Sequence, residues 1–359
     1  MTEMSAMRVS RDHLLTVSDL TVRFRSHGEA VYAVNGVSFD LDAGETLGVA
    51  GESGCGKSVT NLAILGLLPQ PAGRVEAGSV QLSGRELTTL REEELRKVRG
   101  SEIAMIFQDP MTSLNPVLRI EEQLIETIRA HRDVTLQAAR ARAIELLVAV
   151  GVANPESRLR SYPHEFSGGM RQRVMIAMAL ALEPRILIAD EPTTALDVTI
   201  QAQVLDLLRR LTAERGTATI LVTHDLGVLA GMADRINVMY AGKVIESGTT
   251  EELFAHPRHP YTVGLLRSIP RLDGVAGGKL VPIEGRPPDL VAEPVGCSFY
   301  ARCAWRQERC ALEAPPLIQI DGGTQPIVTT GAGATHVAAC FNPVAQAEVA
   351  EGRPAAGRR

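Results

Sequence analysis

The chain has 359 residues and a formal net charge of −5, with 45% hydrophobic and 22% charged residues. This size and composition are those of a soluble globular protein with room for one large domain and a smaller one. Proteins that bind nucleic acid usually carry a basic surplus, so we expect no nucleic-acid partner. The longest apolar run, Val174 to Leu182, has nine residues and is too short to span a membrane. The N-terminal residues lack the apolar segment of a signal peptide, so we expect a cytosolic chain.

The first fifty residues predict a β-rich region. Short apolar runs, each broken by Gly, Asp or His, are typical of strands and turns. These runs are Leu14–Val17, Leu20–Phe24, Val31–Val34 and Val37–Leu41. A further run, Thr46 to Ala50, predicts a buried strand that leads directly into a glycine-rich stretch.

That stretch, GESGCGKS at residues 51–58, fits the phosphate-loop pattern G-x-x-x-x-G-K-[ST] and precedes a helix-forming run. Its glycines let backbone N–H groups turn toward a triphosphate, and the helix N-terminus adds the positive end of its dipole. Lys57 is predicted to reach the β- and γ-phosphates, and the Ser58 hydroxyl to bind Mg²⁺. The predicted nucleotide-binding residues here are Gly51, Ser53, Gly54, Cys55, Gly56, Lys57, Ser58 and Val59.

Further along, an apolar strand at 103–107 ends at Gln108, and residues 118–159 have the apolar spacing of helices. We therefore place a helical subdomain at about 110–182. From Gly169 onward, helices alternate with apolar strands, which favours a mostly parallel α/β sheet.

Two carboxylates, Asp190 and Glu191, directly follow the apolar run Ile186 to Ala189. On a buried strand, Asp190 emerges at the carboxyl edge of the sheet beside the phosphate loop, where it can hold Mg²⁺. Glu191 can then polarise a water molecule aimed at the γ-phosphate. The alternative is a solvated acidic pair at a strand end, and the phosphate loop upstream makes the catalytic interpretation the stronger one.

A third motif, FSGGMRQR at residues 166–173, opens a helix. Ser167 suits the N-cap, and Gly168 and Gly169 leave N–H groups free for an anion. The order of the three motifs resembles the ATP-binding cassette (ABC) family, and the resemblance covers residues 14–270. Phe166 and Met170 replace the ends of the common L-S-G-G-Q signature, but its serine and glycines are intact, so we still expect activity.

The resemblance extends to the Q-loop glutamine (Gln108), the D-loop (Asp197) and the switch histidine (His224). It implies a head-to-tail dimer with each ATP between the phosphate loop of one cassette and the signature serine of the other. Gln108, with Ser58 and Asp190, is then expected to bind Mg²⁺. The implied catalytic residues are Glu191, His224 and Gln108.

Adenine needs an aromatic face, and Phe24 stands where the family places its stacking ring. Tyr32 is the less favoured alternative, because its position suggests strand packing.

The implied fold is α/β: a P-loop NTPase core with an antiparallel β subdomain and a helical subdomain, followed by a small cysteine-bearing extension. We predict boundaries at 8–270 for the ABC nucleotide-binding domain, 271–343 for the extension and 344–359 for a disordered tail.

Asn115-Pro116, HPYT at 259–262 and PIEG at 282–285 resemble the oligopeptide/dipeptide importer ATPases. This implies an ATP-hydrolysing importer subunit on the cytoplasmic face of the cell membrane. The implied partners are two transmembrane permease subunits, a second ABC ATPase subunit and, indirectly, an extracytoplasmic solute-binding protein. The alternatives are another cargo (nickel, glutathione or haem), or a soluble ABC ATPase outside transport.

Four of the five cysteines lie within 44 residues, spaced C-x5-C-x6-C-x29-C. They are Cys297, Cys303, Cys310 and Cys340. Structural zinc sites use tighter pairs, so the spacing favours a [4Fe–4S] cluster over zinc or no metal. Some oligopeptide-importer ATPases carry such a quartet, which supports the cluster. His336 could replace one ligand, and Arg302, Arg306 and Arg309 could offset the negative charge of the cluster.

Overall fold

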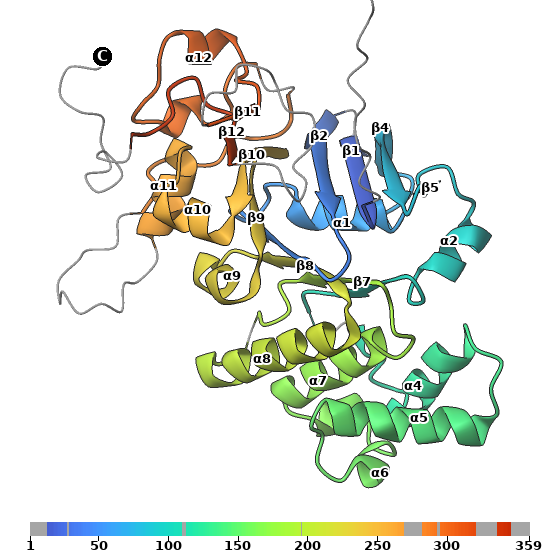
Figure 1. The fold of residues 1–359 in the computed structure, drawn as a ribbon. Coiled ribbons are helices and arrows are strands. Elements are labelled where there is room, and N and C mark those ends of the chain that lie inside the picture. Colours follow the sequence, from blue (N-terminus) through green and yellow to red (C-terminus); the bar gives the residue numbers. More distant parts are fainter. Residues whose placement is uncertain are drawn as a thin grey trace, which may run out of the picture.

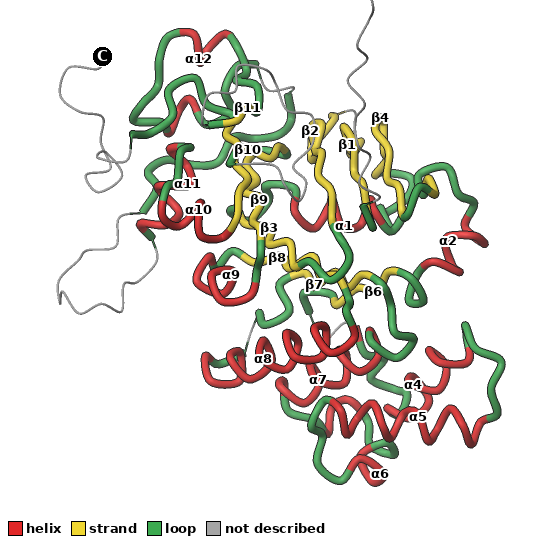
Figure 2. The backbone as a smooth tube through the Cα atoms, viewed as in Figure 1, coloured by secondary structure: helices red, strands yellow, loops and turns green. Residues whose placement is uncertain are grey.

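A computed structural model describes residues 13–26, 29–109, 113–194, 196–268, 282–292, 295–320 and 336–345 (Figure 1). Within these residues the strands form a four-stranded sheet in the order β2-β1-β4-β5 and an eight-stranded sheet in the order β11-β12-β10-β9-β3-β8-β7-β6. Most helices lie on the two sides of the larger sheet, as the colouring by secondary structure shows (Figure 2). None of the described helices is long and apolar enough to cross a lipid bilayer.

The smaller sheet is antiparallel. β1 (Leu15–Ser26) pairs with β2 (Glu29–Leu41) and with β4 (Gly73–Leu82), which in turn pairs with β5 (Arg85–Glu86). The short N-terminal runs expected from the sequence are therefore parts of two long strands. Their pairing shifts register between Val17 and Leu20, where Asp19 has a φ of 49°. The polar breaks in the sequence thus mark bulges in continuous strands.

The larger sheet is parallel over five of its eight strands, up to its edge strand β6, as predicted. Its parallel strands lie in the order β9-β3-β8-β7-β6 and are β3 (Thr46–Ala50), β6 (Ile103–Ile106), β7 (Ile186–Asp190), β8 (Ala218–Thr223) and β9 (Arg235–Tyr240). Every residue of β7 and β8 is buried. Strands covered on both faces have continuous apolar sequences, which is why these runs could be recognised.

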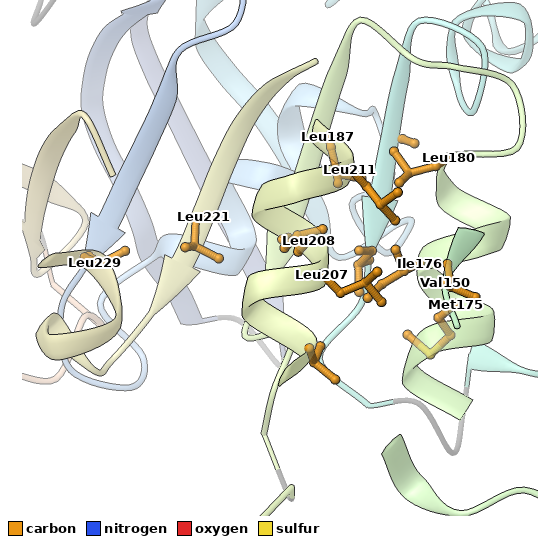
Figure 3. Close-up of a cluster of buried hydrophobic side chains, with 14 of the residues drawn as sticks. Val150, Met175, Ile176, Leu180, Leu187, Leu207, Leu208, Leu211, Leu221 and Leu229 are labelled. Carbon is orange, nitrogen blue, oxygen red and sulfur yellow. The ribbon is translucent and has the colours of Figure 1, made fainter. Parts of the chain in front are cut away.

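Side chains of β7 alternate between two cores. Leu187 and Ala189 join the cluster that holds α7 (Gly168–Ala179) and α8 (Val198–Arg215), whereas Ile186 and Ile188 join the cluster that holds α1 (Lys57–Ile64). Leu207 and Leu208 of α8 and Ile176 of α7 are among the side chains of the first cluster (Figure 3). The two helices therefore cover the face of the sheet opposite to α1.

The remaining helices of the described residues are three to 14 residues long. They are α2 (Glu92–Val98), α4 (Ile120–Arg129), α5 (Leu136–Ala149), α6 (Pro155–Arg158), η1 (Pro163–Glu165), α9 (Leu226–Met232), α10 (Thr250–Ala255), α11 (Pro260–Arg267), η2 (Tyr300–Arg302) and α12 (Arg309–Leu312). In α4, Ile120, Leu124 and Ile128 are buried at helical spacing, so its amphipathic stripe faces the core as the sequence predicted.

The cysteine-bearing extension continues the ATPase sheet. β10 (Lys243–Thr249) pairs with β9, β12 (Val337–Ala338) pairs with β10, and β11 (Ile318–Gln319) pairs with β12. The boundaries predicted at residues 8 and 271 and most of the predicted tail, 346–359, lie outside the described residues. Val344, at the start of that tail, is buried, and its N–H donates to the Arg258 carbonyl at 2.8 Å.

A buried carboxylate fastens this extension to the core. Glu246 on β10 is 0% exposed and accepts the backbone N–H groups of Arg258 (2.6 Å) and His259 (2.8 Å). Its Oε1 also lies 2.6 Å from His336 Nε2. Burial lowers the pKa of His259 to about 4, so this ring is neutral at physiological pH. His336, considered above as a metal ligand, is instead bonded to Glu246.

Candidate active site

The predicted active-site residues follow the carboxyl ends of neighbouring parallel strands. The phosphate loop follows β3, Gln108 follows β6, Asp190 and Glu191 end β7 and open the next turn, and His224 follows β8. Ligands of parallel α/β sheets bind at this edge, because loops from adjacent strands meet there. The topology therefore gathers residues that are far apart in the sequence.

Close backbone packing makes two glycines of the phosphate loop necessary. Gly51 has a φ of 151°, and a Cβ there would lie 2.4 Å from the Met239 carbonyl oxygen. Gly56 has a φ of 103°, and a Cβ there would lie 2.5 Å from the Ala33 carbonyl oxygen. Neither position tolerates a side chain without a shift of backbone. The loop is thus held in one curled shape against β2 and β9.

Within the loop, burial follows the expected roles. Ser53 and Gly54 are exposed at its crest, Cys55 and Gly56 are buried, and Ser58 and Val59 are half-buried. Lys57 is 5% exposed, and its Nζ donates to the carbonyl oxygens of Gly51 (2.7 Å) and Glu52 (3.0 Å). The ammonium group therefore lies inside the curl of the loop, where a phosphate oxygen can replace a carbonyl oxygen as its acceptor.

Asp190 lies beside this loop with one carboxylate oxygen unpaired. Its Oδ1 is buried without a hydrogen-bond partner. Burial raises the pKa of Asp190, and a hydrogen bond from the Ser58 hydroxyl opposes that rise. A hydroxyl and a buried carboxylate oxygen are hard ligands of the kind that Mg²⁺ takes. The pair therefore fits two of the three magnesium ligands expected from the sequence, whereas the side chain of the third, Gln108, donates to Glu191.

Glu191 brings together the three residues predicted to be catalytic. Its Oε2 accepts a hydrogen bond from Gln108 Nε2 at 3.0 Å and lies 3.4 Å from His224 Nδ1. The Thr194 hydroxyl donates to the same oxygen at 3.0 Å, a contact that no sequence pattern suggested. The Glu191 side chain is 14% exposed, so solvent has limited access to it.

The signature residues lie elsewhere. Ser167 caps α7 by accepting the Met170 N–H at 3.4 Å, and Asp197 caps α8 by accepting the Ile200 N–H at 3.0 Å. A Cβ on Gly169 would lie 2.6 Å from Ile200 Cγ2, so the two helix starts pack closely. Because α7 and α8 cover the face of the sheet opposite to α1, the fold does not bring Ser167 and Gly168 to the phosphate loop of the same chain.

Neither candidate for the adenine face is fully free. Phe24 is half-buried and faces Gly73 of β4, where a Cβ would lie 2.7 Å from its ring. The Arg23 guanidinium lies 4.2 Å from the centre of the Tyr32 ring and covers one of its faces. The assignment of Phe24 to adenine stays a prediction.

All four cysteines of the extension line one small cavity, together with Trp305 and Phe341. Burial raises the pKa of Cys303 and of Cys340 to about 12, and the neighbouring thiols add to the rise. Even so, the described residues hold no group of three or more His, Cys, Asp or Glu side chains placed to bind a metal ion. The predicted quartet therefore shares a cavity but does not form a ready ligand set.

Comparison with known proteins identifies the family. The sequence pattern of the ABC transporter family matches residues 34–194, and that of the oligopeptide/dipeptide transporter C-terminal region matches residues 245–310. The chain is 51% identical over 314 residues to the oligopeptide transport ATP-binding protein OppD of Bacillus subtilis (strain 168), covering 88% of this chain and 87% of that protein. The chain belongs to the ABC transporter family. It is also 53% identical over 299 residues to the dipeptide transport ATP-binding protein DppD of the same organism, covering 83% of this chain and 89% of that protein.

Solved ABC structures match the fold as well. A dimeric post-hydrolysis state of the ATP-binding cassette MJ0796, bound to ADP and Pi, has a TM-score of 0.58 and 30% sequence identity. That comparison covers 66% of this chain and 98% of the other. As an ABC ATPase, this chain binds ATP with Mg²⁺ and hydrolyses it.

Proposed function

We propose that this ABC protein is the ATP-hydrolysing subunit of an importer that carries dipeptides or oligopeptides across the cytoplasmic membrane. The observation that carries the proposal is the identity of about half of the aligned residues to OppD and DppD, which extends through both the ATPase and the C-terminal region. The names of these relatives assign them to oligopeptide and dipeptide transport.

In this proposal the residues around the phosphate loop have separate roles in binding ATP, holding Mg²⁺ and hydrolysing the γ-phosphate bond. Lys57 and the N–H groups of the loop bind the β- and γ-phosphates, while Ser58 and Asp190 hold Mg²⁺. Mg²⁺ supplies positive charge that offsets the charge of the phosphate oxygens. Glu191 orients the attacking water and takes its proton, and the bond from Gln108 fixes the direction of that carboxylate. His224 is the contact to the γ-phosphate.

A second cassette completes the site. Within one chain the phosphate loop leads into α1, and Ser167 caps α7 on the opposite face of the sheet, so Ser167, Gly168 and Gly169 are available to the nucleotide of a partner. N–H groups at a helix start are suited to bind an anion. The dimeric cassette of similar fold supports a dimer, and we propose that it is arranged head to tail, with a second copy or a paralogue as the partner.

The permease subunits dock beside Gln108 in this proposal. A cleft between β6 and α7 is lined mostly by apolar side chains, including Met105, Phe107, Met175 and Met178. Phe107 is 42% exposed, an unusual degree for a large apolar ring. Methionine-rich clefts adapt to an apolar helix. Docking here places the chain on the cytoplasmic face of the membrane and links permease movement to the residue that bonds Glu191.

Purification of the tagged chain from detergent-solubilised membranes tests the importer assignment. We expect two multi-span proteins and an extracytoplasmic binding protein to co-purify, and the binding protein to take dipeptides or oligopeptides in a ligand screen. A binding protein specific for nickel, glutathione or haem would reassign the cargo. Recovery only from the soluble fraction, with ribosomal or DNA-bound partners, would exclude transport.

We also propose that the cysteine cavity holds a [4Fe–4S] cluster. The support is the donor set: four thiols and no carboxylate line one cavity, where burial, with a smaller contribution from the neighbouring thiols, raises the pKa values of Cys303 and Cys340. Binding to iron replaces the thiol protons, and the positive charge of the iron then balances the negative charge of the thiolates. Cys297, Cys303, Cys310 and Cys340 would be the ligands, and the cluster would stabilise an extension that has little core of its own.

Anaerobic purification is expected to yield a brown protein with iron and sulfide in near-equal amounts. Cys303→Ser should lose most of the iron, because it removes one of four ligands. Cys55→Ser, outside the cavity, is the matched control and should keep its iron. Zinc alone, or no metal in the anaerobic protein, would refute the cluster.

A further inference from the structure

Glu52, at a position of the phosphate loop where the motif specifies no residue, is held by three fixed partners. Its N–H donates to the Tyr261 hydroxyl at 2.8 Å, and its carbonyl oxygen accepts Lys57 Nζ at 3.0 Å. Its carboxylate is bound by both terminal nitrogens of Arg302, with Nη1–Oε2 at 2.6 Å and Nη2–Oε1 at 2.9 Å. This loop residue is thus anchored to the part of the chain that follows the ATPase sheet.

The Arg302 side chain is 4% exposed and that of Glu52 is 28% exposed, so the pair is partly buried and its arginine is shielded from solvent. Its Nε donates to the Glu284 carbonyl at 3.0 Å, and Nη2 donates to the Ile283 carbonyl at 3.2 Å. Glu52 raises the pKa of Arg302, so the guanidinium stays charged. A paired, fully bonded guanidinium has one preferred orientation, unlike an exposed arginine whose ion pairs contribute little.

Arg302 lies between two residues that line the cysteine cavity, Tyr300 and Cys303. It ends η2, and the next residue, Cys303, donates its N–H to the Tyr300 carbonyl at 3.3 Å. The Arg302 side chain, in contrast, points to the phosphate loop and does not line the cavity. The expectation that this arginine offsets the charge of a cluster is therefore replaced by a specific contact with the ATP site.

Because Glu52 is negatively charged, its contact with Arg302 bears on the binding of ATP. A carboxylate within the phosphate loop repels the negative charges of a triphosphate, and a free carboxylate would also be a competing partner for Lys57. The bidentate pair neutralises the carboxylate and holds it at Arg302, so that Lys57 Nζ bonds the backbone carbonyls of Gly51 and Glu52 and not the Glu52 carboxylate.

We propose that Arg302 is a positioning residue for the phosphate loop, through which the cysteine-bearing extension sets the affinity for ATP. It acts through Glu52 and need not touch the nucleotide. The inference rests on the proposed ATPase role of the phosphate loop, but not on the cargo or on the presence of a cluster.

The test is a double-mutant cycle in the full chain, with E52Q, R302M and the combined variant. Dissociation constants for a non-hydrolysable ATP analogue and steady-state KM and kcat for ATP are measured for each. R302M is expected to raise the dissociation constant and KM about ten-fold while kcat at saturating ATP changes little. The combined variant removes both charges and should recover most of the affinity. R286A, at an exposed arginine of the same extension, is the matched control and should bind as the wild type does.

An R302M protein that is folded by thermal melting and binds the analogue normally would overturn the inference. So would a combined variant that binds as weakly as R302M, because a purely structural defect has no reason to be relieved by E52Q. If R302M does not fold, the combined variant and R302K carry the test. R302K keeps the charge without the bidentate geometry of the guanidinium. An affinity of R302K between that of the wild type and a ten-fold loss supports the inference, as does near-wild-type affinity of the combined variant, whereas wild-type affinity of R302K contradicts it. A wild-type protein without ATPase activity would instead contradict the proposed function.

Discussion

Replacement of Glu191 by glutamine is expected to lower the rate of ATP hydrolysis by about 10² to 10⁴-fold and to leave ATP binding intact. Glutamine has the shape of glutamate, so it can stay near Gln108 and Thr194, whose side chains both donate to Glu191 Oε2 at 3.0 Å. An amide cannot accept the proton of the attacking water, so only the chemical step loses its base. Binding depends on Lys57 and the loop, which the substitution does not touch.

Single-turnover hydrolysis with the partner subunits present measures the chemical step directly, and size-exclusion chromatography with ATP detects the dimer. The variant should accumulate as a dimer with intact ATP, because closure precedes hydrolysis. Glu214→Gln is the matched control, since Glu214 lies on α8 in an exposed pair with Arg210 and should turn over normally. Near-normal turnover by Glu191→Gln would remove Glu191 from the role of base.

The arrangement of the catalytic residues could be predicted because each follows a strand that can be recognised from its apolar sequence. Strands β6, β7 and β8 are short apolar runs, and in a parallel sheet their carboxyl ends meet at one edge. Gln108, Glu191 and His224 then have to converge, whatever the length of chain between them. The family resemblance singled out Gln108 and His224, and the sheet topology explains why both lie close to Glu191.

Contacts between distant segments could not be predicted, because no local pattern encodes them. Arg302 and Glu52 are separated by 250 positions, and neither stands in a periodic run. The pairing of β12 with β10 involves only two residues of β12, which is too short for a strand signal. His336 was weighed as a metal ligand because histidine near cysteines suggests one, whereas its partner, Glu246, lies on a strand that the sequence did not reveal.

Replacement of Lys57 by methionine is expected to raise the dissociation constant for ATP by about 10² to 10³-fold. Methionine keeps an unbranched side chain of similar length but loses the ammonium group. Hydrogen bonds to charged groups contribute about 1.5 to 3 kcal/mol each, and Lys57 is placed to make them to two phosphates. The buried Nζ donates hydrogen bonds to two backbone carbonyls of the loop, so the substitution also removes two hydrogen bonds within the loop.

Protection by the ATP analogue in thermal unfolding measures this loss and also reports whether the variant folds. Analogue at a hundred times the dissociation constant stabilises the wild type by about 2.7 kcal/mol, and the same concentration should barely shift Lys57→Met. Lys97→Met, at an exposed lysine of α2, is the control and should be protected like the wild type. Full protection of Lys57→Met would exclude Lys57 as a phosphate ligand. Adding E52Q to each variant distinguishes the role of Arg302 from that of Lys57. E52Q should restore ATP affinity to R302M but not to Lys57→Met, because Lys57 contacts phosphate directly.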